Sequence, residues 1–245
     1  MASLDLLWKQ LLWDCYHHGH DYTKDDSKVR ELLGNYYFIE RPQDIGLPFN
    51  KKVNNPNDFL NNIKNGLHNL QGYPIKDEAL LSYVTSWNDE KQIYCSDEEH
   101  LEEIGIEEPP FVYTYPERVL HWKYCNKWVN QVNIVLNRLK NNIGSNRAAM
   151  TLYHPGLDAE RKDIPCLNWL QATVRHHRLE LHCIFRSNDL YGAWPANMLF
   201  LTYLGLQISH ELGDDVYFNG IHYHSSSLHI YHTDLPAVKE VLHER

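Results

Sequence analysis

The sequence predicts an α+β fold, because several helical segments surround a mostly consecutive set of strands. Two apolar segments, Pro165–Val174 and Leu179–Phe185, are separated by the polar run Arg175–Arg178 and indicate a β-hairpin. The segment Asn197–His210 is apolar on most of its sides, which is typical of a buried helix. With 245 residues, 43% of them hydrophobic and 22% charged, the chain fits one large domain or two small ones.

Hydrophobic spacing and terminal residues predict the other elements along the chain. Helices are expected at Leu4–Cys15, Asp58–Leu70, Asp77–Trp87, Val129–Leu139 and Leu235–His243. Strands are expected at Leu33–Glu40, Arg147–Tyr153 and Leu228–Tyr231. Residues 88–110 are acidic and irregular, so we expect a surface segment there.

The charge balance limits the partners of the chain. Its formal net charge of −9 argues against non-specific binding to nucleic acid or anionic membranes, since both need a basic face. No run of about 18 apolar residues is present, and Met1–Lys9 lacks an apolar signal region. We therefore expect a protein that spans no membrane, in which a few local arginines could still hold a small anion.

The five cysteines are odd in number and contain no CxxC pair. This pattern argues against a disulfide framework or a zinc ribbon, and it favours the reducing cytoplasm. Histidines gather late in the chain at His222, His224, His229 and His232, but no carboxylate or cysteine has ligand spacing to them. We therefore expect no metal site.

The predicted hairpin brings a cysteine and an arginine together. A turn at His176-His177 pairs Cys166 with Arg186 or Ser187, and opposed Cβ atoms lie about 5 Å apart. A guanidinium at that distance favours the thiolate and lowers the pKa of a cysteine, which prepares it for nucleophilic attack. A single cysteine in a strand is more often a small buried hydrophobic residue, so the spacing by itself leaves both interpretations open.

Four ordered motifs in this part of the chain resemble those of thymidylate synthases. Each motif alone is weak, but their order and intervals match the family, with a small difference before the last one. The resemblance covers residues 110–243 well and the first hundred residues weakly. The matching segments are Pro165-Cys166 with Gln171 (nucleophile strand), Arg186–Asp189 (Arg-Ser-x-Asp), Pro195–Asn197 (Pro-Phe-Asn) and His229–Tyr231 (His-x-Tyr).

The resemblance implies a thymidylate-synthase-like mixed sheet flanked by helices, with a dimer formed through the sheet. It implies a single domain over residues 1–245, with a divergent part at 1–110 and a catalytic part at 111–243. The expected reaction is C5 one-carbon transfer to a pyrimidine nucleotide, from dUMP to dTMP. The one-carbon donor would be 5,10-methylenetetrahydrofolate or a related pterin such as tetrahydromethanopterin.

The same resemblance assigns the nucleophile and the phosphate site. Cys166 would add to C6 of the pyrimidine and make C5 a carbon nucleophile. Arg186, Ser187 and Arg147 would bind the phosphate of the nucleoside monophosphate, a task that suits guanidinium groups. The helix before Ser145-Asn146-Arg147 resembles the helix that leads to Ser-Arg-Arg in the family, where this arginine reaches the neighbouring subunit. A homodimer with shared active sites follows.

Further roles come from the remaining motif positions. Asn197 would bond O4 and N3 of the base, and it favours uracil because cytosine-specific relatives carry Asp there. Asp189 would contact the pterin and a proton relay. The other assignments are His229 and Tyr231 at the sugar hydroxyl, Tyr115 near C5, Glu78 at a water on O4 and Gln171 among the substrate-binding residues.

Each of these residues also has an ordinary structural interpretation. His229 and Tyr231 alternate on a strand and could be half-buried sheet residues. Asn197 could be a helix cap, since amides are common there. Tyr115 could be structural, and Glu78 could simply favour the start of a helix.

The chain departs from the family pattern at several places, which leaves three functions open. The sequence stops at Arg245, soon after His229–Tyr231, whereas the family continues into a tail that closes over the folate. We therefore expect water to be excluded less completely from the active site. Besides the thymidylate synthase reaction, a site more open to water would suit a 5-hydroxymethylase of dUMP, dCMP or CMP. The third function is that of a nucleotide-binding homologue without catalytic activity. The departures are Asp21–Asp25 (phosphate loop), Asn146, Leu167, Phe185, Ala196 and Ser225–Ser227.

Overall fold

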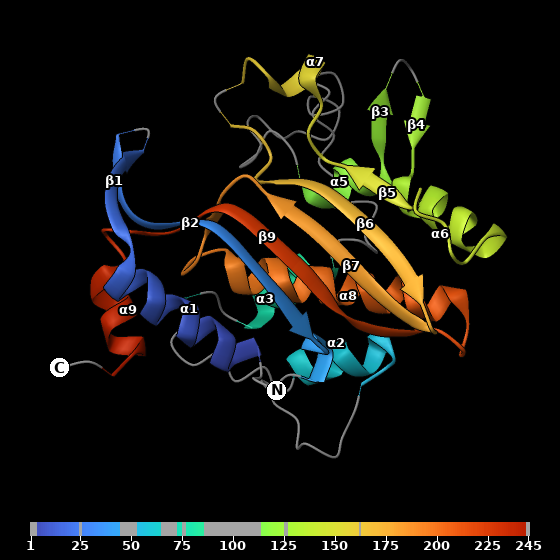
Figure 1. Cartoon of the computed structure of the whole chain (residues 1–245), viewed down its shortest axis with the longest axis horizontal. Coiled ribbons are helices and arrows are strands. Elements are labelled where there is room, and N and C mark those ends of the chain that lie inside the picture. The colour runs from blue at the N-terminus through green and yellow to red at the C-terminus, as the bar shows by residue number, and fades with distance from the viewer. Residues whose placement is uncertain are drawn as a thin grey trace.

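The computed structural model describes residues 4–24, 26–44, 53–64, 73–74, 77–85, 114–124, 127–161 and 163–243. The described part is built on one seven-stranded mixed sheet, in the order β1-β2-β9-β7-β6-β5 with β8 beside β9 (Figure 1). Strand β9 is parallel to β7 and β8, and the other neighbours are antiparallel. The strands are β1 (His20–Lys24), β2 (Ser27–Glu40), β5 (Ala149–Thr151), β6 (Leu167–Arg175), β7 (Arg178–Phe185), β8 (Asn188–Asp189) and β9 (Tyr217–Tyr231).

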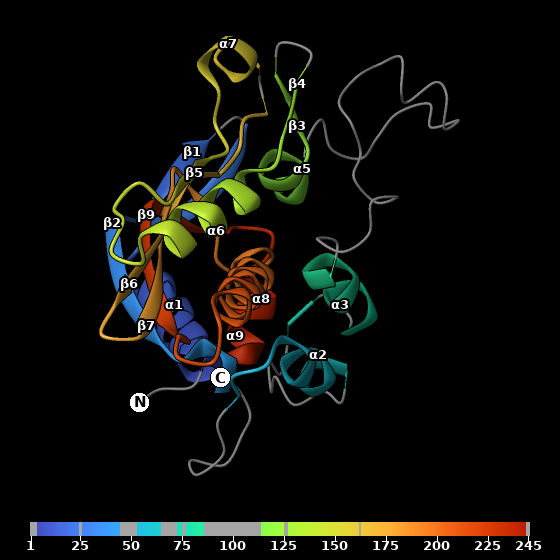
Figure 2. The same ribbon diagram turned by 90° about the vertical axis from the view of Figure 1, so that its right-hand side faces the viewer.

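The described helices gather on one side of this sheet, around the central helix α8 (Trp194–Leu212) (Figure 2). A short hairpin, β3 (Trp122–Tyr124) with β4 (Lys127–Val129), stands apart from the sheet. The other helices are α1 (Leu4–His18), α2 (Pro56–Lys64), α3 (Asp77–Thr85), α5 (Tyr115–Leu120), α6 (Gln131–Asn141), α7 (Pro155–Asp158), α9 (Leu235–Val241) and a 3-10 turn at Pro42–Asp44.

Helix α8 is buried because its sequence is apolar on almost every side, so both the sheet and the outer helices can pack against it. Its contact with β9 is close at Gly205, where an added Cβ would lie 2.3 Å from the ring of Phe218. Nearby, the buried rings of Trp194 and Tyr223 meet edge to face, with centroids 6.2 Å apart, a separation that aromatic pairs prefer. These contacts fix the position of α8 above the middle of the sheet.

The hairpin β6–β7 has the predicted register from its turn as far as Trp169, where the register shifts before Leu167. Gln171 lies opposite His182, and Arg175 lies opposite Arg178. His176 and His177 have φ values of 49° and 66°, which fit the two-residue turns that match the twist of a hairpin. At the far end, the Arg186 N–H donates to the Cys166 carbonyl at 2.8 Å.

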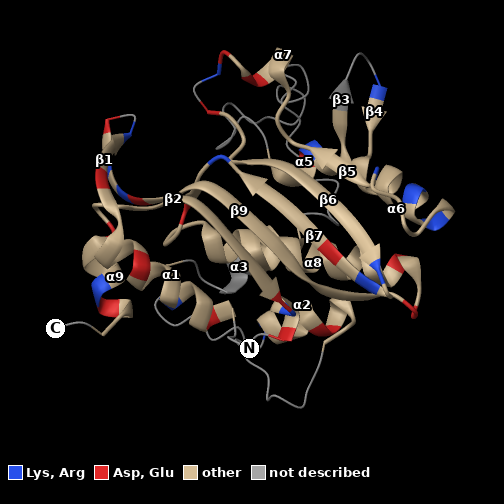
Figure 3. Cartoon of the chain, viewed as in Figure 1, with Lys and Arg blue, Asp and Glu red and all other residues tan. Residues whose placement is uncertain are grey.

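The opposite face of the sheet has no helix of the described part over it. It exposes Tyr36 and Phe38 of β2 and Ile184 of β7, with exposed fractions of 60%, 41% and 41%. Lys and Arg residues are scattered over the described elements in this view and form no continuous stripe across the strands (Figure 3). The described helices include none that is both long and apolar enough to cross a membrane.

The α+β prediction is confirmed, and most expected elements are present. Strand β9 is much longer than expected, because Asn, His and Ser residues interrupt its apolar pattern from residue 219 to 227. Strand β5 is shorter, since Arg147 lies in a turn, and β6 begins only at Leu167, so Cys166 precedes the strand. Residues 65–70, 86–87 and the acidic segment 88–110 lie outside the described residues.

Candidate active site

Cys166 directly precedes β6, an inner strand of the sheet, and its thiol is partly exposed. Its Sγ atom lies 3.7 Å from Oγ of Ser187. The other described cysteines, Cys15 and Cys183, are buried; burial raises the pKa of Cys15 to about 12 and also raises that of Cys183. Among the described cysteines, Cys166 is therefore the thiol that a solute can reach.

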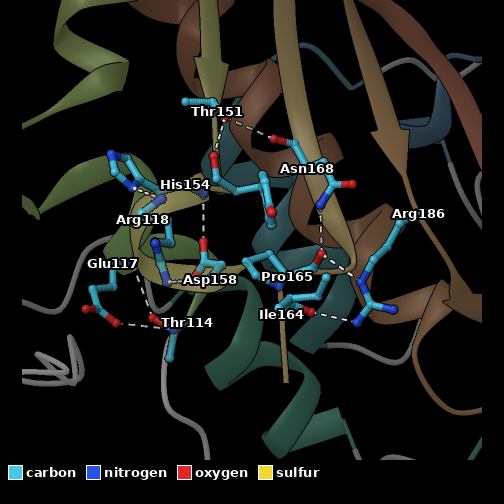
Figure 4. Close-up of polar contacts among 12 residues, drawn as sticks. Thr114, Glu117, Arg118, Thr151, His154, Asp158, Ile164, Pro165, Asn168 and Arg186 are labelled. Carbon is cyan, nitrogen blue, oxygen red and sulfur yellow. Dashed lines mark hydrogen bonds and ion pairs between the residues drawn. The ribbon is translucent and has the colours of Figure 1, made fainter. Parts of the chain in front are cut away.

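Arg186 holds the chain segment that leads into Cys166. Its guanidinium donates to the carbonyls of Ile164 at 2.7 Å and Pro165 at 3.2 Å, and to Oγ of Ser187 at 3.2 Å. The side-chain amide of Asn168 also donates to the Pro165 carbonyl, at 2.8 Å (Figure 4). A guanidinium has five N–H donors, so Arg186 keeps donors for an anion while it positions this segment.

A buried ion pair lies beside this segment (Figure 4). Arg118 of α5 and Asp158 of α7 are 2.7 Å apart, with 3% and 0% of their side chains exposed. The other carboxylate oxygen of Asp158 accepts from the backbone N–H of His154 at 2.7 Å. The pair ties α5 to the loop between β5 and β6, and α5 in turn begins at Tyr115.

Tyr115 lies next to the residue that follows the nucleophile candidate. Its hydroxyl accepts a hydrogen bond from the Leu167 N–H at 3.2 Å. Thr114 caps α5, and it forms a reciprocal capping box with Glu117, which fixes the first turn of the helix. This local structure holds the tyrosine ring beside the start of β6.

Strand β8 brings Asp189 against His229 of β9. One carboxylate oxygen of Asp189 accepts from the backbone N–H groups of Tyr191 and Gly192, both at 3.1 Å. Burial raises the pKa of Asp189. A carboxyl group in this environment can hold or release a proton nearer to neutral pH than an exposed one.

His229 is 2% exposed, and neither of its ring nitrogens has a hydrogen-bond partner in the described part of the chain. Burial, with the positive charges of Lys24 and Arg186, lowers its pKa to about 4. Tyr231 lies edge-on to its ring at 5.2 Å. Two unsatisfied buried nitrogens are costly unless a ligand or water meets them, so they favour a binding role over a purely structural one.

The lowered pKa of His229 predicts a specific pH dependence of stability. The folded protein takes up this proton near pH 4, whereas an unfolded chain takes it up near pH 6.5. Between those pH values the unfolded state binds more protons than the folded state. The contribution of His229 to the free energy of unfolding is therefore fully present above about pH 6.5 and is lost as the pH falls toward 4. We expect His229→Asn to remove up to about 3 kcal/mol of this loss, measured by urea unfolding at several pH values.

The exposed turn residue His176 provides the matched control. Its φ of 49° suits asparagine, so His176→Asn changes a histidine without straining the hairpin. The pH dependence of this variant should follow that of the wild type. If His229→Asn keeps the full wild-type slope below pH 6.5, the buried neutral histidine does not cause it.

Asn197 is buried inside α8 and does not cap it. The helix begins at Trp194, with Ala193 at the cap, so the interpretation of Asn197 as a cap is wrong. Its Oδ1 accepts from the Tyr83 hydroxyl at 2.9 Å, and its Nδ2 donates to Oδ1 of Asn188 at 3.2 Å. Tyr83 and Asn188 were not predicted as site residues: Asn188 fills the variable position of Arg-Ser-x-Asp, and no sequence pattern marks Tyr83.

Other predicted residues lie away from Cys166 within one chain. Arg147 is exposed in the turn before β5, with its carbonyl bonded by the Arg138 guanidinium. Gln171 is five residues along β6 and donates to the Asn146 carbonyl at 2.6 Å. Glu78 belongs to α3, and its side chain is outside the described residues.

A polar cluster occupies the open face of the sheet, where Glu180, His182 and His222 could each offer one ligand atom to a metal ion. Nε2 of His222 lies 2.9 Å from Glu180, and Nδ1 lies 2.7 Å from the Tyr36 hydroxyl. Nε2 of His182 lies 3.1 Å from the Thr173 hydroxyl, and the two imidazole rings are stacked at 4.2 Å. These hydrogen bonds already satisfy most of the ligand atoms, so we assign the cluster to the polar structure of this face.

The fold and the site define an α+β protein with a seven-stranded mixed sheet and a reachable thiol near an arginine, where the inner strands β6 and β7 meet their loops. The family model described as "Thymidylate synthase" matches residues 57–245. The chain therefore belongs to the thymidylate synthase family, as the ordered motifs indicate.

Archaeal relatives agree with this assignment. A protein of Methanothermobacter thermautotrophicus is 28% identical over 239 residues, which cover 96% of this chain and 93% of the relative. A protein of Methanothermobacter marburgensis is 38% identical over 132 residues, which cover 54% of this chain and only 56% of the relative. Both bear the name "Putative thymidylate synthase".

Proposed function

We propose that the chain transfers a one-carbon unit to C5 of a pyrimidine nucleotide, with dUMP as substrate and dTMP as product. The observation that carries this proposal is the partly exposed Cys166 thiol, 3.7 Å from Ser187 and next to the segment that Arg186 holds. A thiolate at Cys166 adds to C6 of uracil, and the electrons displaced from the C5–C6 double bond make C5 nucleophilic. Phosphate binding by Arg186 and Ser187 would hold the substrate for this attack.

The other residues of the site bind or move protons. Asn197 offers an amide that can both donate to O4 and accept from N3–H of uracil. His229 and Tyr231 would bind the sugar hydroxyl, and the unsatisfied nitrogens of His229 support that role. Asp189, with its raised pKa, is suited to a proton relay, while Tyr115 stands beside C5. Glu78 would order a water at O4, and Gln171 would support the substrate side of β6.

The residues present fit a reduced pterin. Oδ1 of Asp189 already accepts two backbone N–H groups, and Oδ2 remains to accept from a ring N–H. Asp189 would hold 5,10-methylenetetrahydrofolate or a tetrahydromethanopterin derivative, which when bound would supply the one-carbon unit and the hydride that reduces it to a methyl group. No metal is part of this proposal.

We further propose that residues 1–245 act as one domain, with the catalytic part at 111–243, in a cytoplasmic homodimer. The open sheet face with Tyr36, Phe38 and Ile184 would form the interface, since exposed aromatic and apolar groups favour association. Arg147, exposed and distant from its own Cys166, would reach the phosphate bound by the other subunit. This assembly would explain why a single chain leaves Arg147 outside the site.

The mass of the nucleotide product tests the proposal most directly. The protein is incubated with dUMP and, separately, each of the two methylene-bearing pterins, and the nucleotide is analysed by mass spectrometry. We expect a product with one added CH₂ group. An extra oxygen in the product would instead identify the hydroxymethylase, whereas nucleotide that binds but never changes would identify a binding homologue.

A further inference from the structure

The segment that carries the Cys166 thiol is held through its carbonyl groups, and Arg186 binds all three of them. Its guanidinium donates to the carbonyls of Ile164 at 2.7 Å and Pro165 at 3.2 Å. Its backbone N–H donates to the carbonyl of Cys166 at 2.8 Å. Pro165 has no N–H, so it cannot fix its own place through a backbone donor. The position of the thiol therefore depends on what binds these carbonyls.

Asn168 supplies a further bond to this segment that does not involve Arg186. Its Nδ2 donates to the Pro165 carbonyl at 2.8 Å, a shorter distance than the 3.2 Å from Nε of Arg186 (Figure 4). A carbonyl oxygen has two lone pairs, so it can accept both bonds. The guanidinium is also the proposed phosphate ligand, whereas the Asn168 amide has no part in the proposed substrate contacts. The bond from Asn168 can therefore hold Pro165 whether or not a nucleotide is bound.

The backbone of Asn168 is fixed by its neighbours in the sheet. Leu167 and Trp169 lie opposite consecutive residues of β7, so Asn168 is the extra residue of a β-bulge, a feature that commonly re-aims side chains next to active sites. Its carbonyl accepts from the N–H of Leu152, directly after β5, at 2.9 Å. Its side chain reaches back to Pro165, three positions earlier in the chain. The amide is thus carried by backbone that β7 and the end of β5 hold in place.

We infer that Asn168 is a positioning residue for the nucleophile: its amide holds the Pro165 carbonyl and thereby keeps the Cys166 thiol where it can attack. The inference rests on the proposed function of Cys166. Attack needs the reacting atoms about 3–3.5 Å apart and aligned, so a displacement of about 1 Å can cost about 10²-fold in rate. Loss of the Asn168 bond leaves Pro165 with the longer bond from Arg186, which moves the thiol by less than that.

Two variants of Asn168 test the inference through the split between rate and binding. Asn168→Ala removes the donor, and Asn168→Asp keeps the shape of the side chain but replaces the donor with an acceptor. In both variants we expect tritium release from C5-labelled dUMP to slow by about tenfold, while the dissociation constant of dUMP, measured by calorimetry, stays within about threefold of the wild type. A loss of folded protein would lower both together.

Alkylation of the thiols reads the position of Cys166 without any substrate. The protein is treated with iodoacetamide, and the modified cysteines are identified by peptide mass spectrometry. In Asn168→Ala we expect Cys166 to react at least about threefold faster than in the wild type, because the released segment exposes the thiol more. The buried Cys15 and Cys183 should stay as protected as in the wild type. General loosening of the fold would instead label all three.

Asn35→Ala is the matched control. Nδ2 of Asn35 also donates to a carbonyl three positions earlier, that of Leu32, at 2.8 Å, but β9 and β7 separate its strand from β6. This variant should keep the wild-type rate of tritium release and the wild-type alkylation of Cys166. The inference is overturned if Asn168→Ala slows tritium release no more than Asn35→Ala does, or if it leaves the alkylation of Cys166 unchanged. If the wild type releases no tritium, the proposed function fails instead, and alkylation alone decides whether Asn168 holds Cys166.

Discussion

Cys166→Ala should abolish release of tritium from C5-labelled dUMP, with a loss of at least about 10³-fold in rate, because no other described thiol is partly exposed. Tritium leaves C5 only after a nucleophile has added at C6, so the assay reports the step assigned to Cys166. Binding of dUMP should persist, since the phosphate and base contacts come from other side chains. The rate is measured with and without the methylene-bearing pterin.

Cys183→Ala supplies the matched cysteine control. Its thiol is buried and donates to the His222 carbonyl at 3.5 Å, away from the candidate site. This variant should keep its rate per folded molecule, with the folded fraction checked by circular dichroism. Equal tritium release from Cys166→Ala and wild type would show that Cys166 is not the nucleophile.

Arg118→Met should lower the free energy of unfolding by about 3–5 kcal/mol, because it leaves the Asp158 carboxylate buried without its cation. Methionine keeps an unbranched stem over the Trp122 ring, which the Arg118 guanidinium covers at 4.8 Å. Most of the lost free energy of unfolding should therefore come from the Asp158 carboxylate, which is left without a partner of opposite charge. Chemical unfolding at neutral pH measures it.

The double variant Arg118→Met with Asp158→Leu should recover much of that stability, since it removes both charges together. Lys140→Met breaks an exposed pair with Glu211, 3.6 Å apart, and should cost less than about 1 kcal/mol. A double variant as unstable as Arg118→Met would mean that the loss comes from packing. The pair would then not be what holds the segment before Cys166.

Local chemistry was enough to predict the hairpin and what it brings together. The alternating apolar residues of β6 and β7 and the polar turn at His176-His177 fix one register, because a shift by one residue would turn each side chain to the wrong face. That register predicts Arg186 or Ser187 opposite Cys166. In the structure a register shift between Leu167 and Trp169 leaves Arg186 opposite Cys166. The all-round apolar character of α8 likewise predicted its burial.

Other parts of the site depend on contacts between distant segments, which no local pattern encodes. Strand β9 was predicted only at its end, because polar residues that lie on the open face or bond within the sheet break its apolar alternation. Tyr83 reaches Asn197 across 114 positions of sequence, so only the packing of α3 on α8 could reveal it. Arg147 is the opposite case. The motif match assigns it to the site, but the fold of a single chain places it far from Cys166.

The sequence by itself determined the α+β class, the hairpin register and the family, because these depend on short periodic patterns and on ordered motifs. The tertiary structure decided how the motif side chains are used. It showed that the Arg186 guanidinium binds the carbonyls before Cys166, that His229 is buried with unsatisfied nitrogens, and that the Asn197 amide is bonded to Tyr83 and Asn188. Hydrogen-bond direction and burial depend on every neighbour in space, and sequence spacing specifies only the neighbours along the chain.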